Sequence, residues 1–199
     1  MYTACVARPR EFDYDRAIDQ AMRLFWAKGY SNTSLRDLLK VMRIGEGSFY
    51  NTVRSKKALF LSCLKHYNDV VTRRRLDALQ SEATVCLAVR RFFACVLDEL
   101  DDPKTPRVCL LAGSLSTDVL VERDLERYVV GEMSTFQQVF VDRLAAAREA
   151  GELPKRFPVK ATAQVLVTYL QGLFRVLGVL NTRREVEAQI EALLRGLGL

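Results

Sequence analysis

The chain is dominated by apolar residues spaced three and four positions apart, which is the period of an α-helix rather than a strand. Ile18, Ala21, Met22 and Phe25 share one helical face, and similar stripes recur to the end of the chain. No alternating run of β-branched residues extends beyond a few positions. We therefore predict an all-α fold of about nine helices, without an internal repeat.

The positive charge is concentrated in the first part of the chain. Residues 1–80 contain 15 Lys and Arg against 8 Asp and Glu, whereas residues 81–199 contain 15 against 16. A compact basic unit beside a neutral one indicates attraction to a polyanion, with a different task for the remainder. The alternative is that this charge merely keeps the N-terminal part in solution.

Two short helices joined by a tight turn are predicted between Ser34 and Val53. Ser34 is placed to cap the first helix, and Gly45 and Gly47 leave the start of the second without side chains. Its backbone N–H groups could then approach phosphates closely. In a basic lobe, this pattern favours a helix-turn-helix, whose second helix enters the DNA major groove.

Four segments resemble the DNA-binding domain of the tetracycline-repressor (TetR) family. They are Phe25–Tyr30 (FWAKGY), Thr33–Leu35 (TSL), Ile44–Tyr50 (IGEGSFY) and Ser55–Phe60 (SKKALF), and Arg8–Asp13 is similar to the opening of one branch of the family. The resemblance implies a homodimer with three N-terminal DNA-binding helices and about six C-terminal helices, the last two pairing across the dimer axis. It also implies a C-terminal pocket whose small-molecule occupant releases DNA. We place the DNA-binding domain at residues 1–58 and the ligand-binding and dimerisation domain at 59–199.

The resemblance also implies which residues contact DNA. These residues would lie in a minor-groove arm, at phosphates or at base edges, and they are Arg8, Arg10, Thr33, Ser34, Gly45, Glu46, Gly47, Ser48, Tyr50, Asn51 and Lys56. Thr33 or Ser34 would also cap the second helix. The chain departs from the family at Arg43, where Gly is common, and at Thr52 and Val53. Glu46 is also unusual, because an acid is repelled by DNA unless it accepts from cytosine N4, so we expect it to add specificity rather than affinity.

The C-terminal stripes supply candidate pocket and dimer residues, each of which could equally be plain core. The predicted pocket walls are Phe92, Phe93, Cys109, Met133, Phe136, Phe140, Tyr169 and Phe174. The predicted dimer interface is Val165, Tyr169, Val176, Ile190 and Leu194. These stripes contain no cluster of charges, which favours an apolar or weakly polar ligand. Regulators of the resembling family sometimes sense electrophiles or oxidants with a cysteine in the region of Cys109. Arg107 is a nearby cation that could lower the pKa of this thiol. The alternative is that Cys109 is a small buried hydrophobic residue.

Enzymatic chemistry is poorly supported by the residue types. His66 is the single histidine and lies mid-helix, and the chain has no HExxH, phosphate-binding GxxxxGK or CxxC motif. We predict no enzyme activity, no cofactor and no metal. The five dispersed cysteines indicate reduced thiols in a cytoplasm, and no apolar run reaches the ~20 residues of a membrane span.

These observations lead to one functional prediction and one rival. The prediction is a cytoplasmic, homodimeric repressor that binds a near-palindromic operator in double-stranded DNA and is released by an unknown small-molecule inducer. An activator is the variant within that class. The rival is a helical small-molecule-binding or scaffold protein whose DNA-binding lobe is vestigial.

Overall fold

The computed structural model describes residues 13–180 and 182–199, and within them every regular element is a helix. The elements are α1 (Tyr14–Lys28), α2 (Leu35–Met42), α3 (Glu46–Val53), α4 (Lys56–Tyr67), the π-helical turn η1 (Asn68–Thr72), α5 (Arg73–Gln80), α6 (Val85–Asp101), α7 (Leu110–Gly113), α8 (Thr117–Leu120), α9 (Arg123–Glu149), α10 (Val159–Leu180) and α11 (Arg183–Leu197). The all-α prediction is confirmed. The described ranges hold more helices than the nine expected, because α7 and α8 have four residues each and are too short to show a periodic stripe. None of these helices is long and apolar enough to cross a membrane.

Local signals set the ends of the first helices. Gly29 ends α1 with φ of 80°, and its N–H donates to the carbonyl of Phe25 at 2.8 Å. Tyr30 then folds back and stacks on Phe25, with ring centroids 6.2 Å apart. The Ser34 hydroxyl accepts from the Asp37 N–H at 3.1 Å and caps α2. These contacts fix the direction in which α2 leaves α1.

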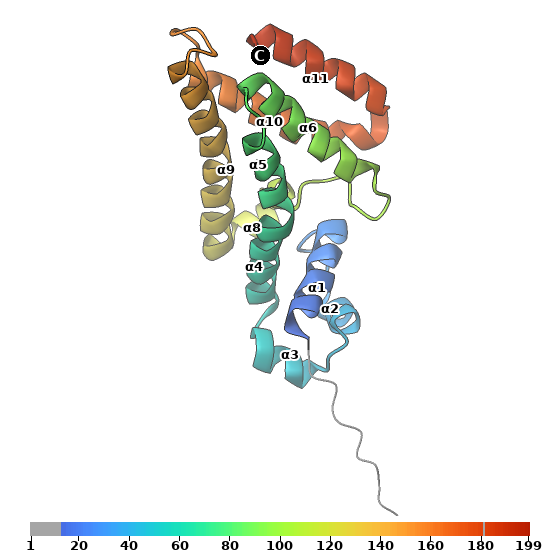
Figure 1. Ribbon diagram of the computed structural model, residues 1–199. Coiled ribbons are helices and arrows are strands. Elements are labelled where there is room, and N and C mark those ends of the chain that lie inside the picture. The colour runs from blue at the N-terminus through green and yellow to red at the C-terminus, as the bar shows by residue number, and fades with distance from the viewer. Residues whose placement is uncertain (1–12, 181) are drawn as a thin grey trace, which may run out of the picture.

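A continuous helical rod connects the two lobes. It runs through α4, η1 and α5, from the small α1–α3 lobe to the C-terminal helices (Figure 1). In the π turn, Asn68 donates to the Tyr128 hydroxyl at 3.0 Å and to the Glu132 carboxylate at 2.8 Å, which holds the rod on α9. The domain boundary predicted after residue 58 falls inside α4, so this helix is common to both lobes.

The C-terminal lobe stacks α6, α10 and α11 at the end of the molecule away from α3, with α9 alongside (Figure 1). Arg90 joins α6 to α11 through paired contacts with Glu191 at 3.0 and 3.1 Å. Arg183, at the start of α11, donates to Asp98 of α6 at 2.8 Å. These pairs position α11 over α6.

Candidate DNA-binding surface and ligand cavity

Helix α3 presents a polar face because its apolar residues are anchored inside the lobe. Phe49 is fully buried and Val53 is buried beside it. The residues on the opposite side are exposed, namely Gly45, Glu46, Gly47, Ser48, Tyr50, Asn51 and Thr52. An eight-residue helix would be marginal on its own, so burial of Phe49 fixes the orientation of this face. The placement predicted for the recognition helix is the one observed.

Close packing within the protomer does not require the glycines at the start of α3. Gly45 has an ordinary extended backbone, with φ of −79°, and no side chain caps the helix there. A Cβ added at Gly45 or Gly47 would meet no atom within 4 Å. Their effect is to leave the first N–H groups of α3 open to a phosphate from outside the protein.

Arginines with positive φ flank α3 on both sides. Arg43 has φ of 57° in the α2–α3 turn, and Arg54 has φ of 66° between α3 and α4. A residue with a side chain loses about 1–2 kcal/mol in the left-handed region, so this backbone is held by its surroundings. Both side chains are exposed. Arg43 was expected only as a departure from Gly, and Arg54 was not predicted, although the two residues that separate α3 from α4 already require a sharp turn.

The structure corrects one predicted DNA contact. Thr33 is fully buried, and its hydroxyl donates to the Gly29 carbonyl at 2.7 Å. It therefore supports the entry to α2 and has no surface to offer a phosphate. Ser34 is exposed and is the residue that caps α2. The predicted arm residues Arg8 and Arg10 lie outside the described residues.

Two adjacent lysines at the start of α4 face different partners. Lys56 Nζ lies 4.6 Å from the centroid of the Tyr30 ring, and partial burial lowers the pKa of Lys56. Lys57 Nζ pairs with Glu122 at 3.2 Å, and this hydrogen bond raises the pKa of Lys57. Lys57 is therefore used to join the lobes, which leaves Lys56 as the candidate for a DNA contact.

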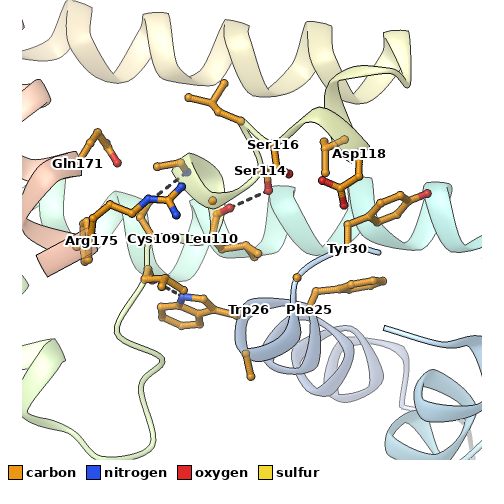
Figure 2. Close-up of a pocket in the computed structure, with 18 of the residues that line it drawn as sticks. Phe25, Trp26, Tyr30, Cys109, Leu110, Ser114, Ser116, Asp118, Gln171 and Arg175 are labelled. Carbon is orange, nitrogen blue, oxygen red and sulfur yellow. Dashed lines mark hydrogen bonds between the residues drawn. The ribbon is translucent and has the colours of Figure 1, made fainter. Parts of the chain in front are cut away.

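A cavity of about 730 Å³ lies where the N-terminal lobe meets the C-terminal lobe. Two contacts border it: Trp26 Nε1 donates to the Val108 carbonyl at 2.5 Å, and the Ser31 hydroxyl donates to Asp118 at 2.5 Å. Its walls come from the end of α1, from the α7–α8 segment and from α10 (Figure 2). A ligand here would touch both lobes at once.

This cavity overlaps little with the predicted pocket. Of the eight predicted residues only Cys109 and Phe174 line it. The other six do not, namely Phe92, Phe93, Met133, Phe136, Phe140 and Tyr169. Phe92 and Phe140 instead pack edge to face, with centroids 5.0 Å apart, and fill the centre of the C-terminal lobe. Trp26 and Arg175, which do line the cavity, were missed.

Cys109 lies at the start of α7, on the cavity wall. Its sulfur accepts a hydrogen bond from the Ala112 N–H at 3.5 Å and from the Tyr67 hydroxyl at 3.6 Å. The side chain is almost fully buried.

Among the described residues, no group of three or more His, Cys, Asp or Glu side chains could hold a metal ion. The single histidine, His66, lies 3.6 Å from Asp19.

The predicted dimer residues divide into two sets. Val165 and Val176 of α10 are exposed, and Tyr169 lies between them with a buried hydroxyl that has no hydrogen-bond partner in the described residues. Ile190 and Leu194 are instead buried within the protomer. The structure corrects the prediction for these last two, because α11 uses its apolar stripe to pack on its own subunit.

Comparison with known proteins agrees with this architecture. The family model described as bacterial regulatory proteins, tetR family, matches residues 17–63. An uncharacterized HTH-type transcriptional regulator of Bacillus subtilis, YezE, is 30% identical over 148 residues, which are 74% of this chain and 76% of YezE. The chain belongs to the TetR family of helix-turn-helix transcriptional regulators. The resemblance seen in the sequence is thereby confirmed.

Two other relatives cover more of the chain. The HTH-type transcriptional repressor ComR of Escherichia coli is 27% identical over 176 residues, 86% of this chain and 84% of ComR. A solved structure of the TetR-family regulator CifR, a cysteine mutant in complex with 26-bp double-strand operator DNA, matches with a TM-score of 0.85 and 28% identity. That match covers 94% of this chain and 98% of CifR. These relatives are regulators rather than enzymes, in agreement with the prediction.

Proposed function

We propose that this TetR-family chain is a homodimeric, sequence-specific repressor that leaves its operator when a small molecule binds at the junction of its lobes. The exposed polar face of α3, fixed from behind by Phe49, is the observation that carries the proposal. ComR is named a repressor, and CifR has been solved with operator DNA. By analogy, this chain acts in the cytoplasm on double-stranded DNA.

The exposed face of α10 supports the dimer. Val165 and Val176 lie on one side of α10, where a second copy would cover both exposed valines. A two-fold axis here gives two copies of α3 that read a near-palindrome, with half-sites about 34–36 Å apart.

Release follows from the cavity's position between the lobes. A ligand shifts a conformational equilibrium only through its different affinity for the two states. Trp26 and Ser31 come from the DNA-binding lobe and their partners Val108 and Asp118 from the other lobe, so an occupant changes contacts that set the tilt of α1. A few kcal/mol between the two conformers would suffice to weaken operator binding.

A thiol-reactive inducer is the second candidate, and the position of Cys109 on the cavity wall favours it. With N-ethylmaleimide as probe, the Cys109 sulfur would add to the alkene, and the thiol proton would end on the adjacent carbon. We expect the reagent to release wild-type protein and Cys95→Ser from DNA, but not Cys109→Ser. Release of Cys109→Ser at the wild-type rate would dismiss this candidate.

Selection from a pool of randomised duplexes tests the main proposal, together with light scattering of the same sample. A repressor of this kind enriches an inverted repeat and has the mass of a dimer. The rival, a binding or scaffold protein with a vestigial lobe, enriches no sequence. Monomeric protein with no enriched repeat would overturn the proposal.

Glu46 provides a sharper test of base reading. If it accepts a hydrogen bond from a cytosine, Glu46→Ala should lose discrimination at one base pair of each half-site, worth about 1–3 kcal/mol. Glu149→Ala, which removes an exposed acid at the end of α9, should leave that preference in place. Uniformly tighter binding of Glu46→Ala to all duplexes would show that Glu46 only repels DNA.

A further inference from the structure

The junction cavity has a positive end and a negative end. Among its lining residues, the charged ones are Arg175 and Asp118. Figure 2 shows Arg175 extending from α10 toward the segment of Cys109, while Asp118 lies at the opposite side beside Tyr30. The cavity therefore offers a ligand two distinct electrostatic environments.

The negative end is already satisfied by the protein. Asp118 accepts from the Ser31 hydroxyl at 2.5 Å and from the Ser31 N–H at 3.2 Å. Hydrogen bonds from Ser116 and Ser31 lower the pKa of Asp118, so it is ionised and paired at neutral pH. A cationic ligand group would have to compete with these bonds.

The positive end is open, because the Arg175 side chain is exposed. Arg175 makes no ion pair or hydrogen bond within the described residues. One turn earlier on α10, the side-chain oxygen of Gln171 is buried without a partner. Buried polar atoms in proteins are normally paired, so a ligand group is expected here. The Gln171 amide can turn either its oxygen or its NH₂ toward such a group.

The rest of the cavity is apolar and aromatic. Phe25, Trp26, Phe60 and Phe174 contribute to its walls. A volume of about 730 Å³ falls within the range of roughly 300–1,000 Å³ found for small-molecule sites. These walls suit an aliphatic or aromatic body of drug-like size or smaller.

We infer that the junction cavity binds a small organic carboxylate with an apolar body. The carboxylate pairs with the Arg175 guanidinium beside Gln171, and the body packs on Trp26 and Phe174. A planar guanidinium is suited to bidentate pairing with a carboxylate. The assignment of this binding site depends only on the geometry of the cavity. The further statement that the bound carboxylate regulates DNA binding rests on the proposed function.

Trp26 makes the binding directly measurable, because it is the single tryptophan of the chain and lines the cavity. The experiment titrates purified full-length protein with phenylacetate and hexanoate, and with their neutral analogues phenylacetamide and hexanamide, while tryptophan fluorescence is recorded. We expect saturable changes, with each carboxylate binding at least tenfold more tightly than its amide. Equal affinity for acid and amide, or no saturable change with any of the four probes, would overturn the inference.

Two variants locate the charge that is responsible. Arg175→Gln should weaken carboxylate binding at least tenfold, and it should leave amide binding and the thermal melting curve unchanged. Arg156→Gln removes the same charge from the exposed α9–α10 connection and should change neither. Unchanged carboxylate affinity in Arg175→Gln would contradict the assigned site.

The same samples, tested with a selected operator duplex, separate this inference from the proposed function. Operator discrimination without carboxylate binding refutes the cavity assignment and leaves the repressor intact. Carboxylate binding without discrimination between duplexes refutes the repressor and leaves the cavity assignment intact.

Discussion

The exposed face of α3 and the junction cavity place their polar groups in opposite surroundings. On α3, Glu46, Ser48 and Asn51 stand in solvent on a helix held by the apolar side of the lobe. In the cavity, the Gln171 side-chain oxygen is buried beside aromatic walls, and Arg175 is exposed at one end. An open polar face suits a large, rigid partner that brings its own complementary surface, whereas a walled site selects a small molecule. Both regions border α4, because α3 contacts this helix and Phe60 of α4 lines the cavity.

The largest expected effect comes from removing the anchor of α3. Phe49→Ala should cost about 3–5 kcal/mol of folding free energy, because it empties a fully buried site, and it should abolish specific DNA binding. Urea denaturation and anisotropy with a labelled duplex measure the two effects. The adjacent Tyr50→Ala, at a half-exposed residue, should weaken DNA binding with less than about 0.5 kcal/mol lost in stability. Full DNA affinity in Phe49→Ala would show that α3 does not depend on this anchor.

The second largest effect is expected at a buried ion pair that stabilises the C-terminal lobe. The Glu99 carboxylate accepts hydrogen bonds from Arg75 Nε at 2.8 Å and from Arg74 Nε at 3.2 Å, and both Arg75 and Glu99 are buried. Glu99→Leu should cost about 3 kcal/mol by urea denaturation, because it leaves the Arg75 charge buried without a partner. Asp69→Asn breaks an exposed pair and should cost less than about 1 kcal/mol.

Adding Arg75→Met to Glu99→Leu should restore at least half of the lost stability. If the double variant is as unstable as Glu99→Leu alone, the loss comes from packing rather than from the unpaired charge.

A smaller effect of opposite sign is expected at the α2–α3 turn. Arg43→Gly should raise the unfolding free energy by up to about 1 kcal/mol, because glycine adopts positive φ without steric cost. If Arg43 contacts a phosphate, Arg43→Gly should also reduce the slope of the logarithm of the DNA association constant against the logarithm of the salt concentration by about 1. Arg36→Gly, within α2, should lose about 1 kcal/mol of unfolding free energy, and urea denaturation measures both variants. Equal losses in both variants would mean that Arg43 is not strained.

The smallest effect is pH-dependent and lies at the contact between the regions. Hydrogen bonds from Ser116 and Ser31 lower the pKa of Asp118 in the folded protein. The folding stability that the ionised Asp118 contributes is therefore fully present above the unfolded pKa of about 3.9, and it is lost as the pH falls through the lower folded pKa. Asp118→Asn should be less stable than wild type by under about 1 kcal/mol at pH 7. That difference should shrink below pH 4. A difference that persists or grows in acid would contradict the assigned sign.

The α2–α3 region was predictable because its signals are local. Ser34 follows the capping rule, and the apolar position of Phe49 fixes which face of α3 is exposed. Thr33 and Arg54 were not placed correctly, since one depends on a hydrogen bond back to α1 and the other on the backbone at a helix junction.

The cavity was not predictable from the same kind of pattern. The two stripes that hold Phe92 and Phe140 look like the stripe that holds Phe25 in sequence, and only tertiary packing decides which one lines a void. Arg175 carried a usable signal, as a lone charge in an otherwise uncharged stretch of α10. It was passed over because the search was for clusters of charge.

The central claim is that this TetR-family chain distinguishes one duplex sequence from others through α3. The most direct test is a mobility-shift titration of the selected inverted repeat against a scrambled duplex, repeated at several salt concentrations. The account predicts a preference of about 10³-fold or more that persists as salt weakens both complexes. Equal binding to both duplexes, falling together as salt rises, would contradict it.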